Sequence, residues 1–301
     1  IHEQQTRPIF ASRPTGMSTA NSSDGRSPAC TLSPEASQVM NHFSDIRVEY
    51  LDHGIAKIIF ARGDVNNTSR PEGLAEVCEA MDILSADEAV RVIVLAADGA
   101  HFSAGADIAF LESLRQKTPA QIKDQVYQYF QGAARRLWHC QKPTIALVQG
   151  AAVSVGCELA LACDFRIAAS DASFMEVWIK FGIMPPLGGL FLLPRIIGMG
   201  RAKDMCLRGI PMPADQALTA GLVSEVVKPE DLQPRGLQVA LELAALPQAA
   251  YATIKESIHR GLSSDMEAEW TANLPNQALL LSSEDFAEGL NAAKQKRAPR
   301  F

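Results

Sequence analysis

Two short glycine-bearing segments contain the residues whose types and spacing are best suited to chemistry. The first, residues 101–108, reads HFSAGADI and follows an apolar run that ends at Ala97. The second, residues 149–159, reads QGAAVSVGCEL and follows a run that ends at Val148. Both have the composition of strand-to-helix turns, and open α/β sheets bind ligands at that end of their strands. The first N–H groups of a helix lack intrahelical partners, so two facing turns can bind the oxygen of an enolate or alkoxide.

Each segment alone is equally compatible with an ordinary strand–helix turn in a core, because short motifs have low specificity. Neither is a nucleotide-binding fingerprint, since GxGxxG and GxxxxGK[ST] are absent. The pair therefore points to a site built from backbone N–H donors.

Glu158 is the ionisable residue of the second segment, and we expect it in the first turn of a helix. The helix dipole favours an ionised carboxylate there, and such a group can move a proton at carbon or activate water. A capping role at the helix start is the alternative, although the apolar neighbours favour catalysis. We expect the side chain to contribute little to stability.

The elements that must position these segments alternate between strand and helix, which indicates an α/β fold with right-handed crossovers. Period-two alternation and β-branched runs predict the strands, and apolar positions at helical spacing predict the helices. Predicted strands are 46–50, 56–60, 90–97, 144–148, 165–168 and 222–227. Predicted helices are 72–84, 118–137, 202–208, 214–220, 230–245, 248–261, 264–281 and one from 284, and a further apolar segment covers 153–163.

The composition excludes several classes of function. A net charge of −6 makes nucleic acid an unsuitable partner. The longest apolar stretch, 145–163, contains Gln149, Ser154 and Glu158 and is too polar to span a membrane. Six cysteines form no CxxC pair and no metal-ligand spacing with the histidines, which predicts free buried thiols, no metal site and a reducing, cytoplasmic location.

The first forty residues are rich in Ser, Thr, Pro and Gln, which predicts disorder. Because the chain begins with Ile1, we expect this segment to be a processed, tagged or over-extended end, with Met40 as a candidate start. A mitochondrial transit peptide is the weaker alternative, because the arginines and serines fit but no apolar helical face is evident. The expected organisation is an extension over 1–40, an α/β core over 41–200 and a mainly helical region over 201–301.

Taken together, the two segments resemble the crotonase, or enoyl-CoA hydratase/isomerase, family. The resemblance extends from Ile46 to Phe301, with its landmarks in order: FSAGADI, KPTIALVQGAAVSVGCELALACDFRIAAS, SFMEVWIKFGIMPPLGG, GLVSEVV and EDFAEGLNAAKQKRAPRF. It implies a ββα spiral core with a helical C-terminal region. It also implies an acyl-CoA thioester substrate, no cofactor beyond that CoA, and a homotrimer or homohexamer.

The resemblance assigns the oxyanion-binding N–H groups to Ala106 and Val155, and it makes Glu158 the first catalytic glutamate. The family usually has glycine where Val155 stands, but valine keeps the N–H. At the position of the hydratases' second catalytic glutamate this chain has Trp178, whose indole N–H only donates hydrogen bonds.

Two other glutamates are candidates for a second acid. Glu176 precedes Trp178 by two residues, so in an extended segment it points to the same side, but a surface position is an equally good interpretation. Glu112 lies in the helix after Ala106, where a solvated face is the favoured alternative.

The resemblance also implies contacts with CoA. The adenine would lie in the loop from Asp64 to Asn67, with Asp64, Asn66 and Ala104 beside the CoA, although the family's usual motif is lost there. Lys296 and Arg297 match basic residues that approach CoA phosphates, often those of a neighbouring subunit, and an exposed basic tail is the alternative.

We interpret the chain as an acyl-CoA enzyme in which Glu158 is the acid/base. A single acid/base suits double-bond isomerisation, decarboxylation, or a hydratase with a substitute second acid. A crotonase homologue that binds acyl-CoA without catalysis is the second hypothesis, motivated by Trp178. A serine hydrolase using Ser154 ranks lowest, because no histidine is near it in sequence.

Overall fold

A six-stranded sheet forms the centre of the structure, a computed structural model that describes residues 42–301. Its strand order is β1-β2-β3-β4-β6-β9; β1 and β2 are antiparallel, and every later pair is parallel. The bounds are β1 (Ile46–Leu51), β2 (Ile55–Phe60), β3 (Val92–Ala97), β4 (Thr144–Val148), β6 (Phe165–Ala169) and β9 (Glu225–Val227). The predicted hairpin and parallel strands are confirmed. The predictions for residues 1–40, including the candidate start at Met40, fall outside the described residues.

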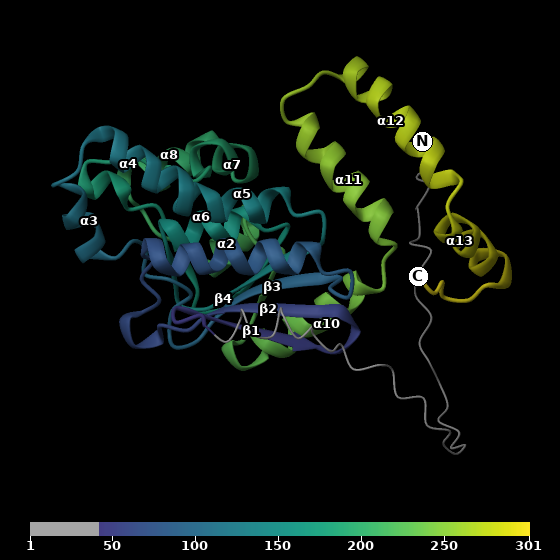
Figure 1. Cartoon of the computed structure of the whole chain (residues 1–301), viewed down its shortest axis with the longest axis horizontal. Helices are drawn as coiled ribbons and strands as arrows, with labels where there is room; N and C mark the ends of the chain where they lie inside the picture. Colours follow the sequence, from purple (N-terminus) through teal and green to yellow (C-terminus); the bar gives the residue numbers. More distant parts are fainter. Residues whose placement is uncertain (1–41) are drawn as a thin grey trace, which may run out of the picture.

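Both faces of this sheet are covered, as a parallel sheet requires. One face packs against α2 (Pro71–Ala86), α5 (Gly132–His139) and α6 (Val155–Ala162). All eight residues of α6 are buried. The other face packs against α10 (Leu232–Ala244), through Leu232, Ala240 and Leu243. Figure 1 shows α2, α5 and α6 on one side of the strands and α10 on the other. Helix α6 therefore lies inside the core, which explains why all its residues except Glu158 are apolar or small.

A second, three-stranded sheet was not predicted from the sequence. It consists of β5 (Ala151–Val153), β7 (Ser173–Met175) and β8 (Met212–Pro213), in the order β5-β7-β8. Strands of two or three residues are too short to show a period-two pattern. This small sheet joins the segment before α6 to the segment that contains Glu176 and Trp178.

The remaining helices agree with the predicted ranges after residue 200 and add α7, which was not predicted. Glycines in the left-handed conformation end α8 and α9, as expected from Gly209 and Gly221. The capping box at Thr118 is also present. The bounds are α3 (Ile108–Leu114), α4 (Pro119–Gln125), α7 (Gly189–Ile196), α8 (Met199–Arg208), α9 (Ala214–Ala220), α11 (Gln248–Gly261), α12 (Met266–Leu281) and α13 (Glu284–Gln295).

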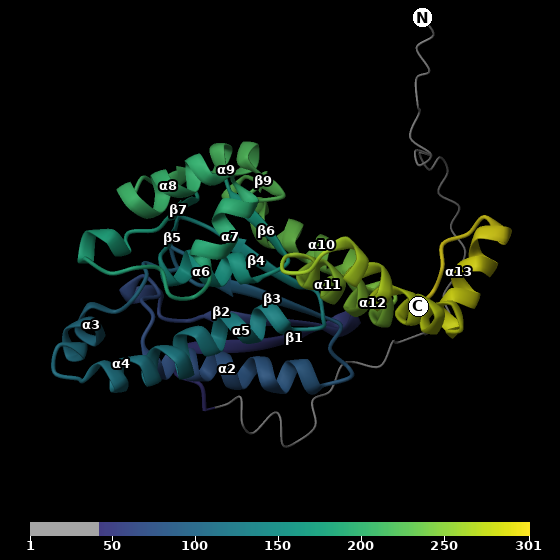
Figure 2. The ribbon, with the colours of Figure 1, turned by 90° about the horizontal axis from the view of Figure 1, so that it is seen from above.

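The last three helices extend away from the sheet. Figures 1 and 2 show α11, α12 and α13 projecting to one side, with the C-terminus on this arm. The arm exposes large apolar side chains, among them Ile254, Ile258, Trp270, Leu274 and Leu279. Within residues 42–301, no helix combines the length and hydropathy needed to cross a membrane.

Candidate active site

The first turn, residues 103–107, is held along its length by the loop that precedes α2. Ala104 N donates to the Asn66 carbonyl (2.9 Å), and Ser69 N donates to the Gly105 carbonyl (2.7 Å). Asp107 then caps α3 by accepting from Phe110 N (3.2 Å). The N–H of Ala106 donates no hydrogen bond within the described residues, so it is available to a ligand.

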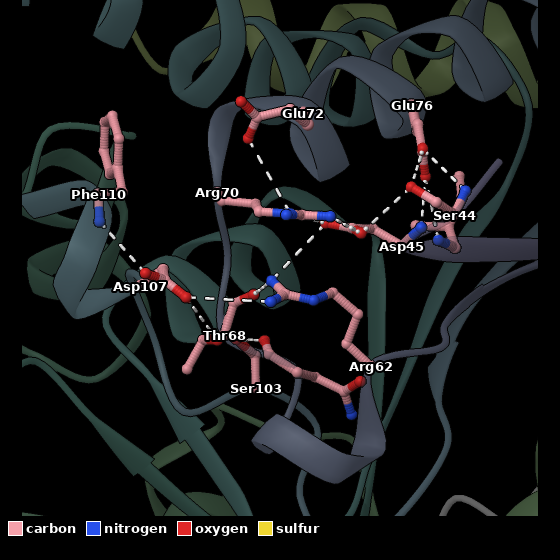
Figure 3. A network of polar contacts seen from close by, with 12 residues as sticks. Ser44, Asp45, Arg62, Thr68, Arg70, Glu72, Glu76, Ser103, Asp107 and Phe110 are labelled. Atoms are coloured by element: carbon pink, nitrogen blue, oxygen red, sulfur yellow. Dashed lines mark hydrogen bonds and ion pairs between the residues drawn. The ribbon is translucent and has the colours of Figure 1, made fainter.

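Charged side chains hold this loop in place, as Figure 3 shows. Arg62 donates to the Thr68 carbonyl (2.9 Å) and lies 3.7 Å from Asp45 and 4.0 Å from Asp107. Asp45 also accepts two hydrogen bonds from Arg70 (2.7 and 2.6 Å). Burial of Asp45 alone would raise its pKa, but Arg70 and Arg62 hold the pKa below its usual value. The network thus ties the start of β1 to the turn that contains Ala106.

Replacing Asp45 by asparagine should loosen this turn. Two guanidinium groups would lose their shared carboxylate, so we expect the free energy of unfolding to fall by about 1–3 kcal/mol. Asp204→Asn is the matched control, because it removes the exposed Asp204–Arg208 pair (2.7 Å). Urea denaturation measures the free energy of unfolding of both variants. If both lose equally little, the network is not needed for stability.

The second turn lies directly against the first. Val153 N donates to the Ser103 carbonyl (2.9 Å), and Ser103 N donates to the Ala151 carbonyl (3.0 Å). A Cβ at Gly156 would stand 2.6 Å from the Ser103 Cβ, so only glycine allows this close approach. The Val155 N–H, like that of Ala106, donates no hydrogen bond within the described residues. The structure therefore brings together the two turns that the sequence singled out.

Ser154 precedes α6 in a strained conformation (φ 47°, ψ −101°) that the small sheet holds. Its N–H donates to the Met175 carbonyl (2.7 Å), and its Oγ accepts from Val177 N (3.2 Å). The hydroxyl is thus occupied in bracing the segment after β7, and no hydrogen bond in the described part of the chain joins it to a histidine. This arrangement gives no support to the serine-hydrolase hypothesis.

Glu158 lies in the first turn of α6 and is 1% exposed. Its Oε2 accepts from Leu187 N and Gly189 N (2.8 Å each), and its Oε1 accepts from Trp178 Nε1 (3.2 Å). Burial raises the pKa of Glu158 to about 7, against the lowering effect of these donors. Such a pKa suits an acid/base near neutral pH.

Two expectations about Glu158 need correction. The capping interpretation is wrong, because the carboxylate accepts from Leu187 and Gly189 near the start of α7 and from Trp178, and not from its own helix. The expectation of little structural contribution is contradicted by the same three hydrogen bonds. The sequence offered no signal for these partners, because Leu187 and Gly189 contribute only backbone groups.

Trp178 begins a short 3₁₀ turn, η4 (Trp178–Phe181), and is 5% exposed. Glu176 is 0% exposed, so its surface interpretation is wrong. Neither carboxyl oxygen of Glu176 has a hydrogen bond of ordinary geometry within the described residues. Burial is the larger cause, and the nearby Glu158 the smaller one, that raises the pKa of Glu176 well above its usual value. Cys157 and Trp178 act in the opposite direction and lower this pKa. The structure thus places two buried carboxyl groups and one indole in a single cluster.

The other candidate residues are distributed differently. Glu112 is exposed on α3 and forms no hydrogen bond with the buried Glu158 or Glu176. Asp64 and Asn66 are exposed in the loop beside the first turn, where the Asn66 carbonyl contacts Ala104. These positions are compatible with the CoA contacts that the resemblance implied.

The basic pair near the C-terminus lies elsewhere. Lys296 and Arg297 follow α13 on the projecting arm, at the opposite end of the molecule from α3 in both ribbon views (Figures 1 and 2). Arg297 forms an ion pair with Glu288 (2.6 Å). The structure therefore does not bring this pair to the first turn of its own chain.

Comparisons with known proteins agree with the architecture. The family model for enoyl-CoA hydratase/isomerase matches residues 51–301. A crotonyl-CoA hydratase of Syntrophomonas wolfei is 33% identical over 82% of this chain and 94% of its own length. A 4-chlorobenzoyl coenzyme A dehalogenase of Arthrobacter is 33% identical over 83% of this chain and 91% of its own.

Solved structures show the same relationship in three dimensions. The enoyl-CoA hydratase of Bacillus anthracis superposes with a TM-score of 0.80, at 30% identity, over 86% of this chain and 99% of that one. A putative enoyl-CoA hydratase from Streptomyces coelicolor superposes with a TM-score of 0.83, at 28% identity, over 93% of this chain and 99% of that one. The predicted crotonase fold is thereby confirmed. The chain belongs to the enoyl-CoA hydratase/isomerase family, and it is an enzyme of the hydratase/isomerase type.

Proposed function

We propose that this enzyme forms a thioester enolate from an acyl-CoA and that Glu158 moves the proton. The N–H groups of Ala106 and Val155 bind the thioester oxygen, where negative charge develops. One observation carries the proposal: a buried carboxyl with a pKa of about 7 lies one helical turn from the Val155 N–H, on a turn packed against that of Ala106. The proposed step moves only a proton, so it needs no redox cofactor.

Among the reactions open to such a site, the residues of this chain favour double-bond isomerisation. The named relatives include a hydratase and a dehalogenase, so family membership alone leaves the reaction open. Trp178 donates its indole N–H to Glu158 and has no proton to exchange in this chemistry. Without a carboxylate at position 178, the hydratases' arrangement of carboxylates at positions 158 and 178 around a water is lost, whereas the transfer of a proton along an enolate is retained.

A panel of acyl-CoA thioesters, analysed by mass spectrometry and NMR, tests this proposal. We expect a β,γ-enoyl-CoA to be converted to the α,β isomer, and crotonyl-CoA to gain water slowly or not at all. Rapid hydration without isomerisation would contradict the assignment. CoA binding without turnover of any thioester would instead support the hypothesis of a non-catalytic acyl-CoA-binding homologue.

We also propose that the enzyme is a homo-oligomer, most simply a trimer or a dimer of trimers. The arm of α11, α12 and α13 exposes more large apolar side chains than a monomer in water would favour. Closed symmetry would bury them against a second copy of the chain. We expect light scattering at micromolar concentration to give a multiple of 32.5 kDa, and a 32.5 kDa particle would contradict this proposal.

A further inference from the structure

Glu176 is a buried acid that the mechanism above does not use. It is 0% exposed, and neither of its carboxyl oxygens has a hydrogen-bond partner of ordinary geometry among residues 42–301. Buried polar groups are nearly always paired, so an unpaired carboxyl beside a catalytic site requires a functional explanation.

The backbone around Glu176 is fixed to the same turn that presents the Val155 N–H. On one side, the Met175 carbonyl accepts from Ser154 N (2.7 Å), and on the other, Val177 N donates to Ser154 Oγ (3.2 Å). Two residues further on, Trp178 donates to Glu158 (3.2 Å). The backbone on both sides of Glu176 is therefore fixed to Ser154, the residue that precedes Val155.

Burial and the neighbouring Glu158 favour the neutral form of Glu176, against the lowering effect that Cys157 and the Trp178 indole have on its pKa. Cys206 of α8 also lies nearby and brings no positive charge. No lysine, arginine or histidine in the described part of the chain forms an ion pair with Glu176. A buried carboxylate without a cation beside it is costly, so these surroundings favour the protonated carboxyl of Glu176.

Glu158 differs from Glu176 because three N–H groups donate to its carboxylate and limit the rise of its pKa to about 7. The site thus contains one carboxyl suited to accept a proton and, beside it, one suited to donate a proton. Neighbouring carboxyl groups whose environments differ in this way commonly divide the roles of base and acid.

We propose that Glu176 is the acid of this enzyme: Glu158 removes a proton from C2 of the thioester, and the carboxyl of Glu176 delivers one to C4. This inference rests on the proposed function and adds a second catalytic residue to it. The C2–H bond breaks, a C1=C2 bond forms, and the carbonyl π electrons pass to the thioester oxygen. When the carbonyl re-forms, the C1=C2 electrons form C2=C3, and the C3=C4 π electrons form the C4–H bond with the proton from Glu176. Transfer of a proton from Glu158 to Glu176 then restores the pair, with no change of oxidation state.

The experiment separates the two proton transfers. A β,γ-enoyl-CoA is incubated in D₂O, and deuterium at C2 of recovered substrate reports enolate formation by Glu158, while the α,β product reports delivery at C4. For Glu176→Gln we expect C2 exchange close to that of the parent, with product formation lower by about 10²-fold or more. Glu79→Gln, which removes an exposed glutamate on α2, should leave both rates unchanged.

Three other results of this experiment would contradict the inference or the proposed function. Unchanged product formation in Glu176→Gln would overturn the inference, because Glu158 would then carry both protons. Loss of both exchange and product in a folded variant would also overturn it, since Glu176 would only support Glu158. If the parent shows neither exchange nor product, the proposed function itself fails.

Glu176→Asp guards against misfolding of the glutamine variant. Aspartate keeps an exchangeable proton but withdraws it by one methylene, so the ratio of product to C2 exchange should lie between those of the parent and Glu176→Gln. If the glutamine variant does not fold, the aspartate variant alone tests the inference. A ratio of product to C2 exchange equal to that of the parent would then overturn it.

Discussion

Replacing Glu158 by glutamine is expected to lower turnover of a β,γ-enoyl-CoA by about 10²–10⁴-fold, the usual cost of losing a general acid–base. Glutamine has a similar size but cannot exchange a proton in this chemistry. CoA binding should remain near that of the parent, because the N–H groups of Ala106 and Val155 belong to the backbone. Steady-state kinetics and calorimetric titration with CoA measure the two effects separately.

Glu256→Gln is the matched control for this variant, because its side chain on α11 is 70% exposed. A Glu158→Gln protein with activity close to that of the control would show that the carboxyl is structural. The glutamine amide would also place an N–H group opposite the Trp178 indole N–H, so melting temperatures must be compared before kinetics are interpreted.

Glu158 also links stability to pH in a defined direction. Its pKa is raised in the folded protein from 4.5 to about 7, so the folded state binds more protons than the unfolded state between those values. The free energy of unfolding contributed by Glu158 therefore falls as the pH rises through this window. The Glu158→Gln variant should lack this part of the pH dependence.

Replacing Trp178 by glutamate is expected to raise hydration of crotonyl-CoA above the low rate of the parent. The substitution restores a second carboxyl at the position where the family's hydratases have one, beside Glu158. Because Glu176 is already close, the variant would hold three acids in one buried cluster, and mutual repulsion should raise their pKa values further. Loss of the buried indole should also destabilise the protein by about 3–5 kcal/mol.

Trp178→Gln is the control, since it has nearly the shape of the glutamate variant and no exchangeable acid proton. Hydration should rise in Trp178→Glu and not in Trp178→Gln. A parent that already hydrates crotonyl-CoA at about 10 per second or more would contradict the account, because that is a typical enzyme rate. A folded, CoA-binding glutamate variant without any gain would show that residue 178 does not face the reacting carbons.

The sheet and most helices could be predicted because their signals are local. Alternation in β1 and β2, the capping box at Thr118 and the closing glycines of α8 and α9 each depend on a few neighbouring residues. The turn at Gly156 was also identified by composition, although its reason is non-local: the helix must pass against Ser103.

The details of the candidate site depend on contacts between distant segments, and the sequence did not reveal them. Leu187 and Gly189 bind Glu158 through backbone groups, which any residue other than proline provides. The burial of Glu176 had a weak signal, since it stands between Met175 and Val177 and alternates with Trp178. The general rule that glutamates are exposed outweighs that signal, and the rule fails here because Glu176 lies against Cys157 of α6 and Cys206 of α8.

Exchange of the C2 protons of a saturated acyl-CoA tests the central claim most directly, because it reports enolate formation whatever reaction follows. The parent enzyme and the Glu158→Gln variant are incubated with butyryl-CoA in D₂O, and the thioester is analysed by mass spectrometry. The account predicts that deuterium enters the substrate with the parent and that the rate falls by about 10²-fold or more in the variant. Equal exchange by both proteins, or none by a folded parent that binds butyryl-CoA, would contradict the assignment of Glu158 as the base.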